Sequence, residues 1–283
     1  MLDTVLLAFA ASLCWGSADF TAGLKARTVS LPVVLLLTQG IGLLLAVGIV
    51  VLGGRQFPAA GPALASLGAG FGVIGGLACF YRALASGTMS VVAPIAATGV
   101  AIPVAVGVLD GEHLALVQMI GMLAAVLGVV FSSRHPDNDP TAADRRLHRR
   151  SIVLALCSAV AFGGYFVLAH VGARGGVGWL LLLAHVTSVA GALGACVIIR
   201  PAMRATPLRD LGVVAAAGIL DLAATGLYGI ATRDGLLSIV AVAGSLYPVT
   251  TVVLARSVLR ERVTGTQMLG ICMALGGVAL IAA

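Results

Sequence analysis

The chain has 283 residues, of which 60% are hydrophobic and only 10% are charged, and its mean hydropathy is +1.10. Soluble domains carry about 25% charged residues, so this composition excludes a water-exposed globular domain. The dominance of apolar residues also excludes a disordered chain. The 17 Lys and Arg against 11 Asp and Glu give a net charge of +6, whose meaning depends on where the charges lie relative to a membrane.

The apolar residues form ten blocks, most of them near 20 residues long. A bilayer core about 30 Å thick needs roughly 20 apolar residues in a helix that rises 1.5 Å per residue. Each block is therefore a predicted transmembrane helix. In chain order the blocks are Leu2–Ala22, Leu31–Gly53, Ala63–Gly87, Thr88–Leu109, Leu114–Ser133, Ser151–Gly172, Val177–Ile199, Arg209–Thr232, Leu236–Val258 and Gly265–Ala283.

The longest polar stretch, residues 134–150, contains five arginines and separates two groups of five helices. Its prolines and charges are typical of a linker. The expected organisation is a first repeat at 1–133, a basic cytoplasmic linker at 134–150 and a second repeat at 151–283. The predicted fold is an all-helical integral membrane bundle.

Positive charges are distributed unevenly between the two sides of a ten-helix bundle. Fourteen of the 17 Lys and Arg lie on one side, and Arg55, Arg174 and Arg233 lie on the other. Short cytoplasmic loops are enriched in Lys and Arg, so the basic side is predicted to be cytoplasmic. Both termini then lie outside the plasma (inner) membrane.

The two halves of the chain resemble each other. The segment Ser12–Ser17 lies 147 residues before Ala159–Gly164, and Tyr81 and Tyr228 have the same offset. A second set of matches has an offset of 149 residues: Glu112 with Glu261, Gln118 with Gln267, Gly121 with Gly270, and Gly128 with Gly277. Five spans per half is an odd number, so the second half is inverted in the membrane. Inverted repeats place a binding site near the midplane, between the halves, and work by alternating access.

Several short motifs occur in a fixed order along the two halves. They are Trp15-Gly16-Ser17, Phe80-Tyr81-Arg82-Ala83-Leu84, the Gly111-Glu112 turn followed by Gln118-x-x-Gly121, and, in the second half, Tyr247-Pro248, Glu261 and Gln267-x-x-Gly270. In order and spacing they are similar to the EamA repeat of the drug/metabolite transporter (DMT) superfamily. The resemblance covers the whole chain. It implies a secondary transporter with ten transmembrane helices, built as two inverted five-helix repeats around a central cavity lined by helices one, three, four, six, eight and nine. Many members of the family export amino acids or other small metabolites.

Ionisable side chains within the spans are functional candidates, because a charge at a helix centre costs about 2.5–3.5 kcal/mol on insertion scales. Asp221 lies in the middle of the eighth span, and Asp19 lies about one turn past Trp15 in the first. Both carboxylates are candidates for binding a substrate ammonium group and for proton coupling. His185, alone in the seventh span, is interpreted as a satisfied polar group.

Aromatic side chains are scarce, and some occupy equivalent positions in the two repeats. Trp15 matches Phe162, and Tyr81 matches Tyr228. The aromatic residues predicted to wall the substrate cavity are Trp15, Tyr81, Phe162, Tyr165, Tyr228 and Tyr247. They would supply apolar surface and hydroxyl groups, with anchoring at the membrane interface as the alternative.

Prolines are predicted to kink the fourth and ninth spans, which are equivalent helices of the two repeats. Pro94 and Pro103 lie in the fourth span and Pro248 lies in the ninth. Broken helices in matching positions indicate a substrate site, and curvature for packing is the alternative. The candidates for neutral hydrogen bonds to the substrate are Thr98, Ser245, Thr225 and Gln39, with interhelical bonds as the alternative.

The sequence thus predicts a multi-pass secondary transporter of small organic solutes. We expect an exporter of amino acids or related metabolites that works by alternating access. Efflux of hydrophobic organic cations is the alternative, and an intramembrane lipid enzyme is less favoured because the sequence shows no catalytic motif. No cofactor, metal or nucleic-acid partner is expected, and the oligomeric state is left open, a monomer included.

Overall fold

The computed structural model describes residues 2–26, 28–86, 92, 95–132, 142–200, 208–259 and 265–282. Within these residues the ordered elements are all helices, with no strand. Six helices are long and apolar enough to cross a membrane, and four shorter apolar helices accompany them. Together they correspond to the ten predicted spans, which confirms the all-helical membrane fold.

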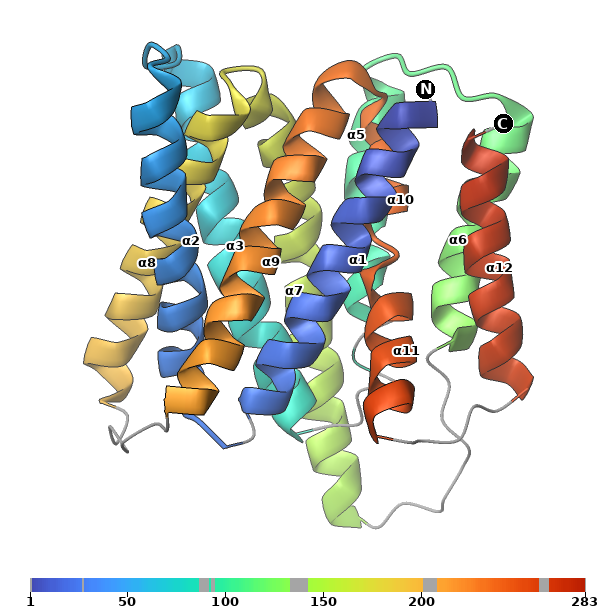
Figure 1. Ribbon diagram of the computed structural model, residues 1–283. Coiled ribbons are helices and arrows are strands. Elements are labelled where there is room, and N and C mark those ends of the chain that lie inside the picture. Colours follow the sequence, from blue (N-terminus) through green and yellow to red (C-terminus); the bar gives the residue numbers. More distant parts are fainter. Residues whose placement is uncertain are drawn as a thin grey trace.

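The helices of the first half are α1 (Leu2–Lys25), α2 (Leu31–Gly53), α3 (Ala60–Ser86), the short 3-10 helix η1 (Thr98–Val100), α5 (Ala101–Leu109) and α6 (Leu116–Ser132). Those of the second half are α7 (Ala142–Ala173), α8 (Val177–Ile199), α9 (Leu208–Asp234), α10 (Leu237–Gly244), α11 (Tyr247–Leu259) and α12 (Gly265–Ala282). Both termini lie at one end of the bundle (Figure 1). We call that end the terminal face, and the opposite end, where α6 ends and α7 begins, the linker face.

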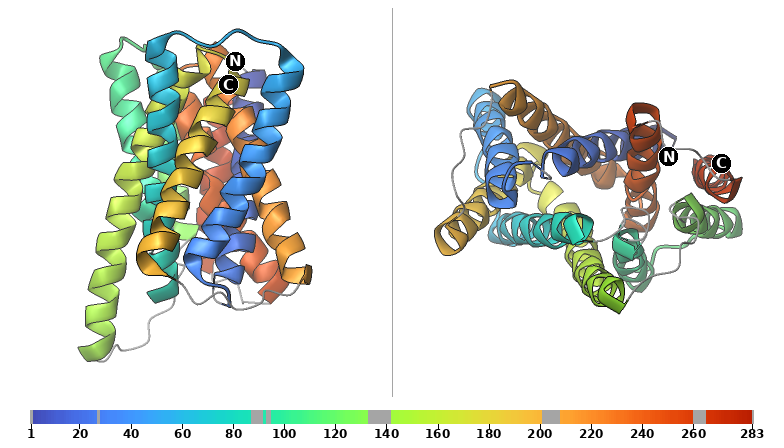
Figure 2. Two further views of the ribbon diagram at one scale, coloured as in Figure 1. Left: turned by 90° about the vertical axis from the view of Figure 1, so that its left-hand side faces the viewer. Right: turned by 90° about the horizontal axis from the view of Figure 1, so that it is seen from below.

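The two halves are inverted relative to each other. Helix α1 starts at the terminal face, whereas its equivalent α7 starts at the linker face (Figure 1). The most extensive helix contacts join the halves: α1 with α9, α3 with α7, α2 with α8, and α6 with α12. Exchanging the halves turns the α1–α9 pair into the α7–α3 pair, as a two-fold relation requires. The α6–α12 pair lies at one edge of the bundle (Figure 2).

The fourth and ninth spans are both interrupted. In the fourth, η1 precedes α5, and in the ninth, α10 ends at Gly244 and α11 begins at Tyr247. Pro103 lies in the first turn of α5 and Pro248 in the first turn of α11, where a missing backbone N–H is tolerated. At the repeat offset of 147 residues, η1 corresponds to the segment between α10 and α11. The breaks thus occupy equivalent positions, and Pro94 lies outside the described residues.

Each break packs against the first helix of the opposite half at a glycine. A Cβ atom on Gly16 of α1 would lie 2.5 Å from the carbonyl oxygen of Tyr247, and one on Gly163 of α7 would lie 2.5 Å from that of Gly99. The hydroxyl of Thr251 also donates to the carbonyl oxygen of Gly16 at 3.1 Å. Gly16 and Gly163 are 147 residues apart, so the same close backbone approach is made twice, by related residues.

Several helices extend past the predicted spans. Helix α7 begins at Ala142, nine residues before the predicted start at Ser151, and α1 continues to Lys25 instead of ending at Ala22. Hydropathy marks where a chain crosses the bilayer, but a helix continues into water through good helix formers such as Ala, Arg and Leu. The second half of the predicted linker is therefore helical.

Glu112 joins the two halves at the terminal face. It follows Gly111, whose φ of +90° lies in the region that favours glycine. The carboxylate accepts two backbone hydrogen bonds from the start of α10: Oε1 from the N–H of Leu237 at 2.5 Å and Oε2 from that of Ser238 at 3.0 Å. The N-cap residue of α10, Leu236, makes no side-chain capping bond. Glu112 therefore caps α10 from the other half of the chain.

We expect the substitution Glu112→Ala to lower the thermal unfolding midpoint of the detergent-solubilised protein, because a lost N-terminal cap costs about 0.5–2 kcal/mol. Asp110 is an exposed residue of the same turn, so Asp110→Ala serves as the matched control and should leave the midpoint unchanged. Equal midpoints for the two variants would contradict the capping role.

Candidate functional site

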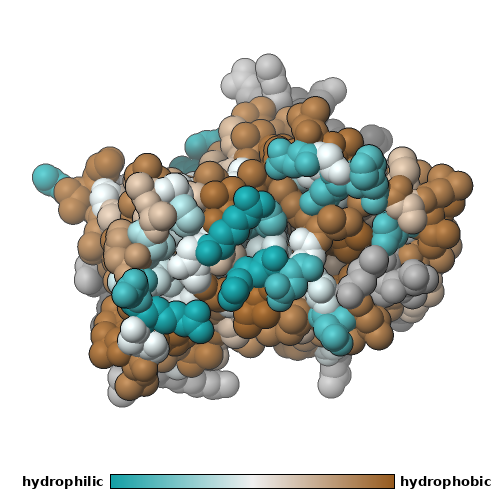
Figure 3. Space-filling model, turned by 90° about the horizontal axis from the view of Figure 1, so that it is seen from above, coloured by the Kyte–Doolittle hydropathy of each residue, from teal (hydrophilic) through white to brown (hydrophobic). Residues whose placement is uncertain are grey.

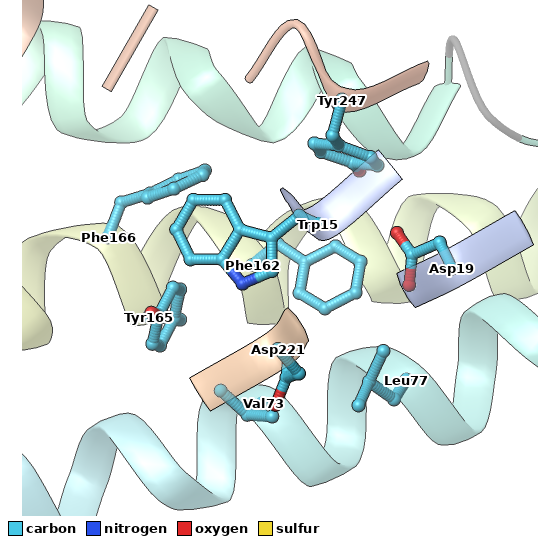
Figure 4. Close-up of a pocket in the computed structure, with 9 residues that line it drawn as sticks. All are labelled: Trp15, Asp19, Val73, Leu77, Phe162, Tyr165, Phe166, Asp221 and Tyr247. Carbon is cyan, nitrogen blue, oxygen red and sulfur yellow. The ribbon is translucent and has the colours of Figure 1, made fainter. Parts of the chain in front are cut away.

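A pocket lies at the centre of the bundle, between α1, α3, α7, α9 and α11 (Figure 4). The residues that line it are Trp15, Asp19, Val73, Leu77, Phe162, Tyr165, Phe166, Asp221 and Tyr247. About 410 Å³ between them is free of protein atoms, the opening included, but only about 40 Å³ is open to the centre of a water molecule. That volume holds a few water molecules, so an organic solute requires the walls to move apart.

Asp221 reaches this pocket from α9. Its side chain is 16% exposed, and its Oδ2 atom accepts a hydrogen bond from Nε2 of Gln39 on α2 at 3.1 Å. Nε2 of His185 on α8 lies 3.9 Å from the same oxygen. Gln39 and His185 are not among the residues that line the pocket. They support the carboxylate from outside the pocket, and Trp15, which lines the pocket, contacts it from the pocket side.

Asp19 brings a second carboxylate to the pocket, from α1. Its Oδ1 atom accepts a hydrogen bond from the hydroxyl of Tyr81 on α3 at 3.0 Å, and the residue is 8% exposed. Of the nine described residues that line the pocket, Asp19 and Asp221 are the charged ones. The pocket therefore combines apolar walls with two carboxylates.

Aromatic residues flank the pocket in two groups, one toward each face of the bundle. The terminal-side aromatic group consists of Trp15, Tyr165, Phe166 and Tyr228, in which the Trp15 ring centroid lies 5.7–5.9 Å from the other three. The linker-side aromatic group consists of Phe80, Tyr81, Phe162 and Tyr247, with centroid distances of 5.9–6.5 Å. Edge and tilted contacts of this kind add stability beyond the area that they bury.

Two residues of each group are related by the inverted repeat, Trp15 to Phe162 and Tyr81 to Tyr228. Tyr81 donates to the carboxylate of Asp19 at 3.0 Å, and Tyr228 donates to the carbonyl oxygen of Phe166 at 3.1 Å. Asp19 and Phe166 are 147 residues apart, as are the two tyrosines. The same contact is therefore made once at each end of the pocket. The ends differ in one respect, since the acceptor is a charged side chain toward the linker face and a backbone carbonyl toward the terminal face.

A polar recess opens on the terminal face, where hydrophilic side chains gather around a hollow (Figure 3). About 590 Å³ of it is open to the centre of a water molecule. Its charged and titratable lining residues are Asp110, Glu112, His170, Arg174, Arg233 and Asp234. Val5, Ile239 and Val240 also line it and belong to the same buried cluster as Tyr228. The apolar floor of the recess therefore packs in the same hydrophobic cluster as the terminal-side aromatic group.

The structure brings six of the eleven predicted site residues to the pocket wall: Trp15, Asp19, Phe162, Tyr165, Asp221 and Tyr247. Tyr81 and Tyr228 contact those residues without lining the pocket. Thr98 and Ser245 lie at the two helix breaks, where their hydroxyls donate to carbonyl oxygens of their own helices at 2.6 and 2.8 Å. Neither is among the lining residues, and Pro94 lies outside the described residues.

Other pocket residues were missed by the sequence analysis. Val73, Leu77 and Phe166 line the pocket but carry no chemical signal that distinguishes them from packing residues. Phe166 could have been found, because it is the repeat equivalent of Asp19. Gln39, a candidate for neutral hydrogen bonds, makes an interhelical bond to Asp221 and does not line the pocket.

The fold defines a multi-pass helical membrane protein with inverted halves around a central pocket. The model of the EamA-like transporter family matches residues 3–134 and again residues 149–283. The chain therefore belongs to the EamA-like transporter family. Because this is a family of drug and metabolite transporters, the protein is a transporter of small solutes, and the membership counts against an intramembrane lipid enzyme.

Solved structures share this fold. One crystal structure of a protein matches with a TM-score of 0.79 and 19% sequence identity, over 98% of this chain and 97% of that chain. In all, 27 solved chains match. An identity this low shows the fold and not the substrate. No curated protein matches the sequence.

Proposed function

We propose that the protein exports amino acids, or closely related metabolites with an ammonium group, by alternating access. The observation that carries this proposal is the central pocket, in which Asp19 and Asp221 are the charged lining residues. A carboxylate binds an ammonium group through charge-assisted hydrogen bonds, and aromatic faces attract cations. None of the described residues that line the pocket is cationic, so a purely anionic solute is disfavoured.

A hydroxyl in the same pocket suits the carboxylate of an amino acid. The Tyr247 hydroxyl is buried and has no hydrogen-bond partner among the described residues. A buried polar group without a partner is costly, and a solute carboxylate that accepts a bond from this hydroxyl would remove that cost. The carboxylates and the hydroxyl together favour a zwitterion.

The two aromatic groups would act as the gates of the transport cycle. Opening the terminal-side aromatic group would connect the pocket to the polar recess, and opening the linker-side aromatic group would connect it to the other face. Inverted repeats suit such a cycle, because the contacts made at one gate can be remade by equivalent residues at the other. The Tyr81–Asp19 and Tyr228–Phe166 bonds are candidates for contacts broken in turn.

The direction of transport follows from the proposed orientation. Most Lys and Arg residues of the sequence belong to the linker face, so we place that face in the cytoplasm and both termini outside the plasma membrane. Export then carries the solute from the linker face to the recess. The proposed division of the chain is the one expected from the sequence, with repeats at 1–133 and 151–283 joined by a basic linker.

Efflux of hydrophobic organic cations is the second candidate. It is favoured by the aromatic walls and by the same two carboxylates, which can pair with a quaternary ammonium group as well as with a primary one. The Tyr247 hydroxyl separates the two candidates, because a cation without a carboxylate leaves it unpartnered.

A counterflow experiment tests the proposal. Proteoliposomes preloaded with an unlabelled solute are supplied with the same solute in labelled form, and its accumulation is compared with that in protein-free liposomes. The panel contains amino acids, the matching carboxylic acids without the amino group, quaternary ammonium cations, sugars and nucleosides. We expect exchange of amino acids and none of the deaminated acids. Exchange restricted to the quaternary cations would replace the proposal by the second candidate.

A further inference from the structure

His185 is buried behind the pocket with one ring nitrogen unpartnered. The residue is 3% exposed, and its Nδ1 atom bonds to the carbonyl oxygen of Leu181 at 2.7 Å. A carbonyl oxygen only accepts, so Nδ1 carries the hydrogen in this bond. Nε2 therefore has a lone pair when the ring is neutral. It makes no hydrogen bond within the described structure, and it lies 3.9 Å from Oδ2 of Asp221.

Helix α2 fixes the ring beside that carboxylate. Any Cβ atom on Gly42 would overlap the His185 ring, so the ring packs directly on the α2 backbone. Gln39 lies three residues earlier, on the same helix face, and donates to the same Asp221 oxygen as the one that His185 approaches. The bare backbone at Gly42 and the amide of Gln39 therefore hold the two ionisable side chains side by side.

We infer that His185 and Asp221 form one proton-binding site that exchanges its proton for the ammonium group of the solute. This inference rests on the function proposed above. With one proton bound between Nε2 and Oδ2, the pair is neutral overall, and without it the pair carries one negative charge. The ammonium group of a bound solute neutralises the pair in the same way, while the carboxylate of a zwitterionic solute keeps its own charge and accepts a hydrogen bond from the Tyr247 hydroxyl. An uncompensated charge on the pair within the membrane is costly. The site therefore changes the face to which it opens only with a proton or a solute ammonium group bound to the pair.

The exchange balances in atoms, and at the pair itself one positive charge replaces another. A solute ammonium group arrives at the Asp221 carboxylate through the pocket, and the proton shared with His185 leaves through the same pocket to water. His185 returns to the neutral imidazole with its hydrogen on Nδ1, still bonded to Leu181. No covalent bond other than N–H or O–H changes. Since Asp221 lines the pocket and His185 does not, the proton reaches the imidazole by way of the carboxylate.

Other ionisable groups surround the pair and must be separated from it in any test. Those that face Asp221 are Asp19 from α1, Tyr81 from α3, Tyr165 from α7 and His185 from α8, and the neutral Gln39 faces it from α2. Asp19 is the second carboxylate of the pocket and also a candidate proton site. It differs in having a tyrosine hydroxyl as its partner instead of a base.

The test measures protons and solute in the same proteoliposomes. A solute that undergoes counterflow is added outside, its uptake is followed by label, and proton movement is followed by a pH-sensitive dye trapped inside. The variants are His185→Gln and Asp19→Asn, and His113→Gln is the control because His113 is exposed in the turn before α6. We expect wild type and the control to move protons against the solute. Asp19→Asn should transport more slowly, because a pocket carboxylate is lost, but should keep the wild-type number of protons moved per solute.

We expect His185→Gln to lose about tenfold or more in protons moved per solute while counterflow is largely kept, since the variant lacks the base but not the carboxylate. Protons and solute are both moved by the folded protein in the same proteoliposomes. The number of protons moved per solute therefore does not depend on the yield of folded protein. An unchanged ratio in His185→Gln, or loss of proton movement in Asp19→Asn instead, would overturn the inference. Wild-type counterflow without proton movement would overturn it too, whereas absent counterflow would overturn the proposed function.

Discussion

Replacing Asp221 by asparagine is expected to reduce transport more than any other single change in the pocket. Asparagine keeps an oxygen that can accept the Gln39 hydrogen bond, so the local fold is retained, but the charge that pairs with the solute is lost. Losing one partner of a buried charge pair costs about 2–5 kcal/mol, which corresponds to about 30-fold or more in affinity. The initial rate of counterflow at a solute concentration below saturation measures this loss.

The Asp221→Asn result needs a control for protein quality and for charge. Asp3→Asn makes the same chemical change at an exposed position in the first turn of α1 and should transport at the wild-type rate. Elution of both variants as a single species in detergent would show that each is folded. Counterflow within about threefold of wild type in Asp221→Asn, against the 30-fold expected from charge pairing, would remove this residue from the solute site.

The spans could be predicted because the bilayer imposes a single requirement on every helix that crosses it. Ten apolar blocks correspond to the helices of the structure because backbone groups in lipid must bond within their own segment. Their ends could not be predicted in the same way. The bilayer does not limit the length of a helix in water. Helix propensity therefore decides how far α7 extends on the N-terminal side of residue 151.

The two carboxylates of the site could be predicted because burying them is costly wherever they point. The other lining residues depend on the rotation of each helix about its axis. Gly and Ala are common on all faces of these helices, so hydropathy does not distinguish a face toward lipid from one toward the pocket. Thr98 and Ser245 carry suitable hydroxyls, yet their bonds go to their own helices, while Phe166 lines the pocket.

The arrangement around His185 shows a further limit of sequence analysis. As a lone histidine in an apolar span, it gave no sign of a partner, and interpreting it as a satisfied core residue was the reasonable expectation. The structure leaves its Nε2 unsatisfied and places it next to Asp221. The contact depends on Gly42, a residue that the sequence presents as one of many small residues for packing. The contact between His185 and Asp221 joins side chains of α8 and α9 and depends on α2. Spacing along the sequence does not reveal a contact of this kind.

Replacing Gly16 by alanine is expected to destabilise the fold strongly, whereas the same change at Gly48 should stabilise it slightly. At Gly16 the new Cβ atom would lie 2.5 Å from both the Tyr247 carbonyl oxygen and the Thr250 Cβ atom, so α1 and α11 must separate. Overpacking of this kind costs about 1–3 kcal/mol. At Gly48 nothing lies within 4 Å of the added atom, and alanine is favoured over glycine inside a helix by about 0.5–1 kcal/mol.

The thermal unfolding midpoint of each purified variant in one detergent measures the difference. Gly163→Ala provides an independent comparison, because the repeat places Gly163 in the equivalent contact against Gly99. If the inverted repeat governs packing at the breaks, both Gly16→Ala and Gly163→Ala should fall below wild type and Gly48→Ala should not. A midpoint for Gly16→Ala at or above that of Gly48→Ala would mean that α1 and the break before Pro248 are not packed backbone to backbone. The pocket wall formed by Trp15 and Tyr247 would then need a different geometry.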